Sequence, residues 1–171
     1  MIVLEMDRIK NRDDLRRLFL TYSDELYKFA YTRLGYNKEA TEDLLQELFI
    51  KVWDNKEKYD PVLGSIRTWL YAILRNMIID TYRKRKLKQV EIRDDEPDLK
   101  GDGSIIDNEY LIESYMKKLD PKQHELLLLR YQQDLEISEI AKIVGKNQNN
   151  VRVSIHRAIK KIKDLMEKDN G

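Results

Sequence analysis

The sequence predicts an all-α protein made of two small helical domains joined by a flexible acidic linker. Apolar residues recur at spacings of three and four along most of the chain, and no stretch alternates apolar and polar residues as a strand would. At 171 residues and 42% hydrophobic content, the chain can build two small cores. The segment 89–107 lacks this periodicity and is rich in acids and turn residues, so it separates predicted domains at 1–88 and 108–171.

Three helices are expected in the first domain. The first spans 13–34 and ends at a Gly-Tyr-Asn break. The second spans 38–55 and is followed by an Asp-Pro turn. The third spans 66–86, and Ser65 is its expected N-cap.

The helix over 38–55 has two contrasting faces. One face is apolar and is expected to join the core. The other mixes acids with Ile50 and Trp53, a combination more typical of a docking surface than of a solvated one. Helical geometry alone leaves a second reading open, in which the same domain covers Ile50 and Trp53. The core face comprises Leu44, Leu45, Leu48, Phe49 and Val52, and the other comprises Asp43, Gln46, Glu47, Ile50, Trp53 and Asp54.

The helix over 66–86 combines aromatic and cationic residues on one side. Such a side suits stacking on unpaired bases and contacts along a phosphate backbone. A core helix with a basic exposed end is the alternative, and it would be preferred for this helix taken alone. Trp69, Leu70, Ile73 and Met77 are expected to face the core. The aromatic and basic side comprises Arg67, Tyr71, Arg75 and Tyr82 and leads into Arg83, Lys84, Arg85 and Lys86.

The second domain ends in a predicted helix-turn-helix. Its helices are expected over 108–119, 121–133, 137–144 and 149–166. Ala141 is small enough for two helices to approach closely, and Gly145 can adopt the positive φ of a tight turn. Val151 then packs the last helix against the one before it.

The last helix has a basic face that suits a DNA major groove. Asn150, Arg152 and His156 are the candidates for contacts to base edges, and the lysines for contacts to phosphates. A generic helical hairpin with a solvated basic face is the alternative. The buried face comprises Val151, Ser154, Ile155, Ala158, Ile159, Ile162 and Leu165, and the other comprises Arg152, Val153, His156, Arg157, Lys160 and Lys163.

Composition excludes several classes of function. With no cysteine, the chain has no disulfide, thiolate zinc site or cysteine nucleophile. Its two histidines lie far apart, and no ligand spacing predicts a metal site. The N-terminal residues become polar too early for a signal peptide, and no apolar run approaches the roughly 20 residues of a membrane span. We therefore expect a soluble, cytoplasmic protein without a cofactor and without membrane insertion.

The formal net charge of +1 hides two basic patches, at 83–88 and 152–163, separated by acidic residues. The hypothesis that the chain is an enzyme would depend on the carboxylates of Asp43 and Glu47, which share a helix face. No base, nucleophile, metal cluster or glycine-rich phosphate loop accompanies them, so no catalytic residue is predicted.

Three segments, in this order, resemble the extracytoplasmic-function sigma factors. The sequence over 43–53 resembles the polymerase-binding part of their conserved region two. The sequence over 69–76, with Asp80 and Arg83 after it, resembles their promoter-melting helix. Three parts of the second domain together resemble their region four: Leu119-Asp120-Pro121, Glu139-Ile140-Ala141 and the stretch from Val151 to Leu165.

The resemblance implies a non-enzymatic promoter-recognition subunit of RNA polymerase. Its implied partners are core RNA polymerase, promoter DNA in duplex and single-stranded form, and an anti-sigma factor. The loop over 58–64 lies where this family captures a flipped base. Together with the faces above, the resemblance assigns polymerase binding to Asp43, Gln46, Glu47, Phe49, Ile50 and Trp53. It assigns the minus-ten element to Tyr59, Arg67, Trp69, Tyr71, Arg75, Asn76, Asp80, Arg83, Lys84 and Arg85. It assigns the minus-thirty-five element to Asn149, Asn150, Arg152, Val153, His156, Arg157 and Lys160.

The chain departs from the family pattern at the start of the last helix, where Asn-Gln-Asn-Asn at 147–150 replaces the usual Ser/Thr-Gly-Thr run. The acidic linker either stays away from DNA or occupies a basic polymerase channel. The rival to the sigma-factor reading is a stand-alone helix-turn-helix regulator whose first domain dimerises or senses a ligand. Such a regulator would bind duplex DNA tightly without polymerase.

Overall fold

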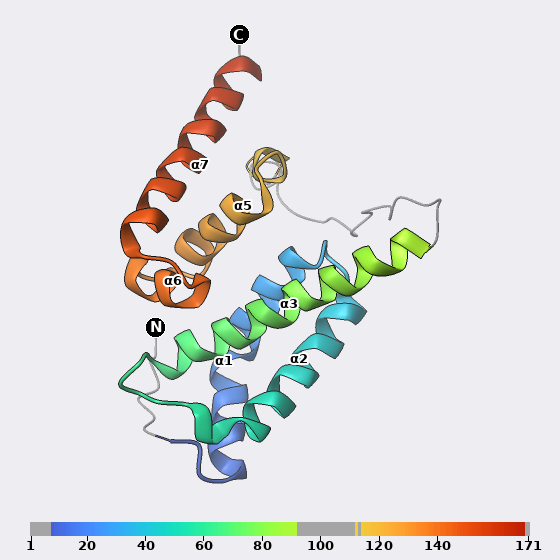
Figure 1. Cartoon of the computed structure of the whole chain (residues 1–171), viewed down its shortest axis with the longest axis vertical. Helices are drawn as coiled ribbons and strands as arrows, with labels where there is room; N and C mark the ends of the chain where they lie inside the picture. The colour runs from blue at the N-terminus through green and yellow to red at the C-terminus, as the bar shows by residue number, and fades with distance from the viewer. Residues whose placement is uncertain (1–7, 92–111, 113, 170–171) are drawn as a thin grey trace. The chain divides into compact units, whose positions relative to one another are not determined.

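A computed structural model describes residues 8–91, 112 and 114–169 of the chain (Figure 1). The chain divides into two compact units, Met1–Gly101 and Asp102–Gly171. Every regular element among the described residues is helical, which confirms the predicted all-α class. Among these residues, no helix is both long enough and apolar enough to cross a membrane.

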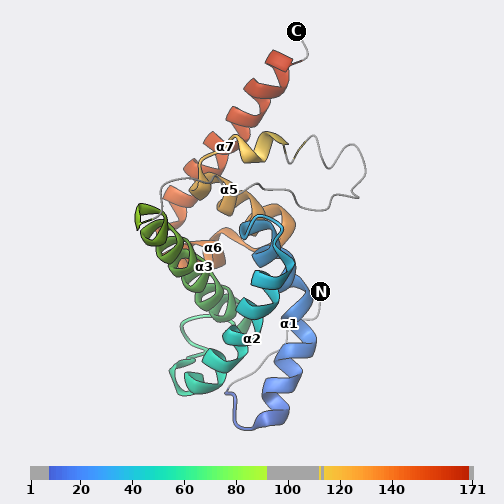
Figure 2. The same cartoon turned by 90° about the vertical axis from the view of Figure 1, so that its right-hand side faces the viewer.

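The first unit is a bundle of three helices that all contact one another, α1 (Arg12–Arg33), α2 (Lys38–Asp54) and α3 (Ile66–Glu91) (Figure 2). A 3₁₀ turn, η1 (Lys56–Lys58), follows α2. The centre of the bundle is apolar and closed to solvent. Its fully buried side chains include Leu18, Leu26, Phe29, Leu48, Val52, Leu70 and Leu74.

The helix starts of this unit are capped by side chains, as the sequence predicts for α3. The hydroxyl of Ser65 accepts a hydrogen bond from the Thr68 amide at 3.1 Å. Asn11 and Asp14 form a reciprocal capping box at the start of α1. These contacts satisfy amides that have no partner within the helix.

The end of α1 is a Schellman motif. Gly35 has φ of 69°, and the Tyr36 amide donates to the Tyr31 carbonyl at 2.8 Å. The rings of Tyr31 and Tyr36 meet edge to face with centroids 5.3 Å apart, which supplies the apolar contact typical of this motif. This motif turns the chain sharply from α1 toward α2.

The helix α3 continues to Glu91, five residues beyond its predicted end at 86. Residues 89–91, the first three of the predicted linker, are therefore helical. No glycine or proline interrupts the sequence before 97, so nothing local stops the helix where we expected it to stop. The remainder of the predicted linker lies outside the described residues.

The second unit contains α5 (Pro121–Leu127), the π turn η2 (Leu128–Gln132), α6 (Ile137–Val144) and α7 (Gln148–Asp169). Residues 114–117 before them are also helical. Figure 1 shows α6 at the N-terminal end of α7, and α7 contacts both α5 and α6. The predicted helix over 121–133 is correct in position, but its last five helical residues are wound as a π turn rather than an α-helix. The core includes Leu129, Leu135, Ile140, Val151 and Ala158.

Candidate functional site

The exposed face of α2 carries the predicted docking residues. Ile50 is 60% exposed, so the alternative in which its own domain covers it is wrong. Trp53 is partly covered, because the Lys56 ammonium lies 4.1 Å from its ring centroid. The residues that surround them and remain exposed are Asp43, Gln46, Glu47 and Asp54.

Phe49 differs from the other residues assigned to polymerase binding. Its side chain is 8% exposed, and its ring meets Phe19 edge to face at a centroid distance of 5.1 Å. The helix turns Phe49 toward α1 with Leu45 and Val52, as the faces derived from the sequence indicate. Phe49 therefore belongs to the core and supports the exposed face from beneath.

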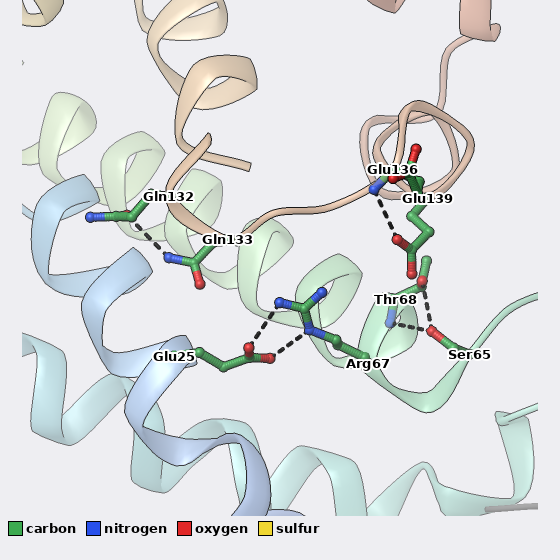
Figure 3. Close-up of polar contacts among 8 residues, drawn as sticks. All are labelled: Glu25, Ser65, Arg67, Thr68, Gln132, Gln133, Glu136 and Glu139. Carbon is green, nitrogen blue, oxygen red and sulfur yellow. Dashed lines mark hydrogen bonds and ion pairs between the residues drawn. The ribbon is translucent and has the colours of Figure 1, made fainter. Parts of the chain in front are cut away.

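The structure corrects the predicted aromatic and basic side of α3. Arg67 and Tyr71 are buried, with exposed fractions of 4% and 0%. The Arg67 guanidinium donates from Nε and Nη2 to the two carboxylate oxygens of Glu25 on α1, each at 2.8 Å (Figure 3). Its carbon Cζ lies 5.6 Å from the ring centroid of Tyr71. Neither side chain therefore belongs to an exposed aromatic and basic side of α3.

The reason for this error is the width of the covered arc of α3. This helix packs against both α1 and α2, so more of its circumference is buried than that of a helix with one neighbour. Tyr71 also meets Phe29 edge to face at a centroid distance of 5.5 Å. Burial raises the pKa of Tyr71 well above its ordinary value, so the phenol stays neutral. Tyr59, also assigned to DNA, is buried beside Trp69 with ring centroids 5.5 Å apart.

An open cavity of about 230 Å³ lies where α2 and η1 meet α3. Its walls bring together an aromatic ring, amides, lysines and one carboxylate. Three of the residues assigned to the minus-ten element line it: Trp69, Asn76 and Asp80. Sequence reasoning missed the residues opposite them, Lys51 and Asn55, whose i,i+4 spacing places them on the flank between the two faces of α2. Lys58 completes the rim.

The loop that follows η1 presents two apolar side chains to solvent. Val62 and Leu63 are the most exposed large apolar residues of the described chain. The Asp60 carboxylate accepts a hydrogen bond from the Val62 amide at 2.9 Å, which fixes the turn. Farther along α3, Asn76, Asp80, Arg83 and Lys84 are exposed and Arg75 is partly exposed, whereas the Arg85 side chain lies outside the described residues.

The helix-turn-helix of the second unit has the predicted geometry. Gly145 adopts φ of 65°, and the Lys146 amide donates to the Ala141 carbonyl at 2.9 Å. The Asn147 carboxamide oxygen then caps α7 by accepting from the Asn150 amide at 2.8 Å. The predicted exposed face of α7 is exposed throughout. On the predicted inner face, Val151, Ile155 and Ala158 are buried, whereas Ser154, Ile159, Ile162 and Leu165 are only partly covered. The side chains assigned to the minus-thirty-five element, Asn149, Asn150, Arg152, Val153, His156, Arg157 and Lys160, are all exposed.

Replacing Gly145 with valine is expected to destabilise the second unit by about 2 kcal/mol, because a β-branched residue is strained at positive φ. A Cβ at Gly145 would meet no atom within 4 Å, so the cost comes from the backbone and not from a clash. Asparagine tolerates this conformation, so Gly145→Asn is the matched control and should cost less than half as much. Urea unfolding followed by circular dichroism measures both. Equal costs for the two variants would contradict this account.

Each of the two units matches the model of a known protein family. The family model for Sigma-70 region 2 matches residues 18–88, and that for Sigma-70 region 4 matches residues 110–162. The RNA polymerase sigma factor YlaC of Bacillus subtilis is 30% identical, with 94% of this chain and 96% of YlaC covered. The ECF RNA polymerase sigma factor SigX of the same organism is 29% identical over 88% of this chain and 82% of SigX.

A longer relative, the ECF RNA polymerase sigma factor BldN of Streptomyces coelicolor, is 27% identical over 99% of this chain and 66% of its own length. Two solved structures share the fold. The sigma factor RpoE from Bartonella quintana, in complex with the anti-sigma factor NepR, has a TM-score of 0.71 at 21% identity over 91% of this chain and 98% of that chain. CnrH, in complex with the cytosolic domain of CnrY, has a TM-score of 0.69 at 24% identity over 93% and 91%.

The helical fold and the two family models therefore define a two-unit protein of sigma-70 type, with region 2 in the first unit and region 4 in the second. The chain belongs to the extracytoplasmic-function (ECF) RNA polymerase sigma factors. This family is not known as a family of enzymes.

Proposed function

We propose that this chain is an alternative sigma factor that binds core RNA polymerase, directs it to a promoter and helps to open the DNA. The observation that supports this proposal most directly is the exposed face of α2. Ile50 and Trp53 are large apolar groups, ringed by Asp43, Gln46 and Glu47, on a helix whose other face already fills the core. Such a surface suits a protein partner.

Polymerase docking is assigned to the α2 face. A large aromatic group surrounded by polar residues is the usual anchor of a protein interface. Asp43 and Glu47 supply an acidic rim, which favours a basic partner surface, and Gln46 adds a neutral hydrogen-bonding group. Phe49 contributes by holding α2 against Phe19 and not by touching the partner.

Single-stranded promoter DNA is assigned to the cavity between α2 and α3 and to the basic end of α3. Trp69 offers a ring for stacking, and Asn76 and Asp80 offer hydrogen-bonding groups for a base edge. Lys51 and Lys58 can contact the phosphates on either side of such a base. Arg83 and Lys84 extend the cationic surface along α3.

Duplex DNA is assigned to the exposed face of α7. The N-terminal half of the second helix of a helix-turn-helix enters the major groove. Its side chains can therefore contact base edges and phosphates of the upstream element.

Strand opening in this proposal uses binding energy alone. Unstacking a base step costs a few kcal/mol. Stacking of an exposed base on an aromatic ring returns about 1–3 kcal/mol, and docking on polymerase places both units on one promoter at high effective concentration. The chain therefore acts without catalysis and without a cofactor, in the cytoplasm where polymerase and chromosome meet.

We further propose that an anti-sigma factor controls it by covering these surfaces, since RpoE, which shares the fold, forms a complex with the anti-sigma factor NepR.

Co-elution of the purified full chain with bacterial core RNA polymerase tests the proposal. A stable complex on gel filtration is the expected result. The stand-alone regulator predicts the opposite pattern, in which the chain does not bind core polymerase but shifts duplex DNA alone. That pattern would overturn the sigma-factor assignment.

If the exposed face of α7 contacts DNA phosphates, a substitution on it should change the salt dependence of promoter binding. Replacing Lys160 with glutamine removes one phosphate contact, so the slope of log affinity against log salt should become shallower by about 1. Promoter binding by the reconstituted holoenzyme, measured at several salt concentrations, gives this slope. Lys168→Gln is the control, because Lys168 lies about two helical turns farther along α7, in its last turn. A slope unchanged by Lys160→Gln would remove this lysine from the DNA interface.

A further inference from the structure

The side chains of α7 that lie farthest from its core form a single ridge. Val151, Ile155 and Ala158 are buried and define the inward direction of the helix. At about 100° per residue, the opposite direction is occupied by residues spaced four, three and four apart. The members of this ridge, all exposed, are Asn149, Val153, His156 and Lys160.

Of the three base-edge candidates derived from the sequence, only His156 lies on this ridge. Asn150 and Arg152 lie roughly a quarter turn to either side of the ridge. Those positions suit the walls of a groove, where phosphates run, more than its floor, where base edges lie. The residues of the ridge are therefore better placed to read bases.

The presence of a valine at position 153 of the ridge is not explained by the stability of the helix. The structure describes α7 in full, and Val153, 40% exposed, is the one exposed apolar residue on it. A β-branched residue is also less favourable in a helix than the lysine or glutamate that would suit a solvated position. An isopropyl group facing the floor of a major groove has one distinctive target, the 5-methyl group of thymine.

Asn149 offers a complementary chemistry one turn earlier. The carboxamide oxygen of Asn147 is engaged in capping α7, whereas Asn149 is exposed on the ridge in the first turn of the helix. A carboxamide can donate to N7 and accept from N6 of adenine in a paired contact. The helix rises about 6 Å from Asn149 to Val153, close to two base steps of about 3.4 Å.

We propose that α7 reads an adenine with Asn149 and, about two base pairs away, the methyl group of a thymine with Val153. This inference rests on the proposed function, in which α7 enters the major groove of duplex promoter DNA. Asn149 belongs to the segment 147–150, where the sequence departs from the run usual in its family. His156 and Lys160 continue the ridge toward the neighbouring base pair and phosphate.

The test begins with the 171-residue chain bound to core RNA polymerase. Holoenzyme selects from promoters randomised across the upstream element, and we expect an adenine and a thymine, on the same or opposite strands, about two base pairs apart. At the selected thymine, deoxyuridine then removes the methyl group alone. At the selected adenine, 7-deazaadenine removes the N7 acceptor alone.

Wild-type holoenzyme should bind the deoxyuridine promoter about three- to fourfold more weakly, from the loss of one buried methyl group. It should bind the 7-deazaadenine promoter at least about fivefold more weakly. Val153→Ala should lose only the first discrimination, and Asn149→Ser only the second. Glu167→Gln, exposed near the far end of α7, is the matched control and should keep both.

Two results would overturn the inference. In the first, wild-type holoenzyme shows no preference for adenine or thymine, or binds the analogues as well as the parent bases. In the second, each discrimination persists in its own variant. Either result, obtained with a holoenzyme that still initiates transcription, refutes the base assignment alone. Failure of the chain to bind core polymerase would refute the proposed function instead.

Discussion

Replacing Trp53 with alanine is expected to weaken binding of the chain to core RNA polymerase about 100-fold. Trp53 and Ile50 are the large apolar groups of the α2 face, and tryptophan is the side chain most often found at an interface hot spot. Loss of such an anchor typically costs at least about 2 kcal/mol of binding free energy, and nearly 3 kcal/mol corresponds to this factor. Because Trp53 is only partly buried in its own unit, the fold should tolerate its loss.

Equilibrium titration of core polymerase with fluorescently labelled chain measures this affinity. Glu39→Gln is the matched control, because Glu39 is exposed in the first turn of α2, far along the helix from Trp53. It should bind as the wild type does. If Trp53→Ala binds core polymerase with unchanged affinity while its circular dichroism matches that of the wild type, the α2 face is not the docking surface.

Replacing Glu25 with glutamine is expected to destabilise the first unit by about 3–5 kcal/mol. The Arg67 guanidinium is 4% exposed and donates two charge-assisted hydrogen bonds to the Glu25 carboxylate, which is 24% exposed. Neutralising Glu25 removes the carboxylate that accepts both charge-assisted hydrogen bonds while the guanidinium stays buried, which is the costly way to break a buried pair. Arg67→Leu should cost less, because the remaining carboxylate can reach water.

Both tryptophans, Trp53 and Trp69, lie in the first unit, so urea unfolding followed by tryptophan fluorescence reports this unit separately. Lys38→Gln is the control. It breaks an exposed i,i+4 pair with Glu42 at 3.8 Å and should change stability by less than about 0.5 kcal/mol. A loss for Glu25→Gln no larger than that of the control would show that the Arg67–Glu25 pair contributes little to the fold.

Local sequence signals predicted the helices and the helix-turn-helix well. The start of α2 and both ends of α6 fall where periodicity and turn residues indicated. Two local properties determine the turn: Gly145 lacks a Cβ and so adopts a positive φ, and Ala141 has a small side chain. The two faces of α7 follow from spacing alone, because one side of that helix packs and the other does not.

Arg67 and Tyr71 were misplaced because their burial depends on α1, which is distant in sequence. The partner of Arg67 is Glu25, 42 residues earlier, and no local pattern links the two. The cavity beside Trp69 was missed for the same reason, since it forms only where the flank of α2 meets α3. A basic or aromatic residue on a helix of a three-helix bundle can therefore be assigned to DNA only once its neighbours are known.

Transcription reconstituted from purified components tests the central proposal most directly. Core RNA polymerase is combined with the full chain and a library of genomic promoter fragments, and the 5′ ends of the transcripts are mapped. If the chain is a sigma factor, transcripts start at discrete positions only when it is present, and thymines near those positions become reactive to permanganate as the strands open. If the chain binds core polymerase but neither directs discrete starts nor opens DNA, or if it does not bind core polymerase, the proposal is contradicted.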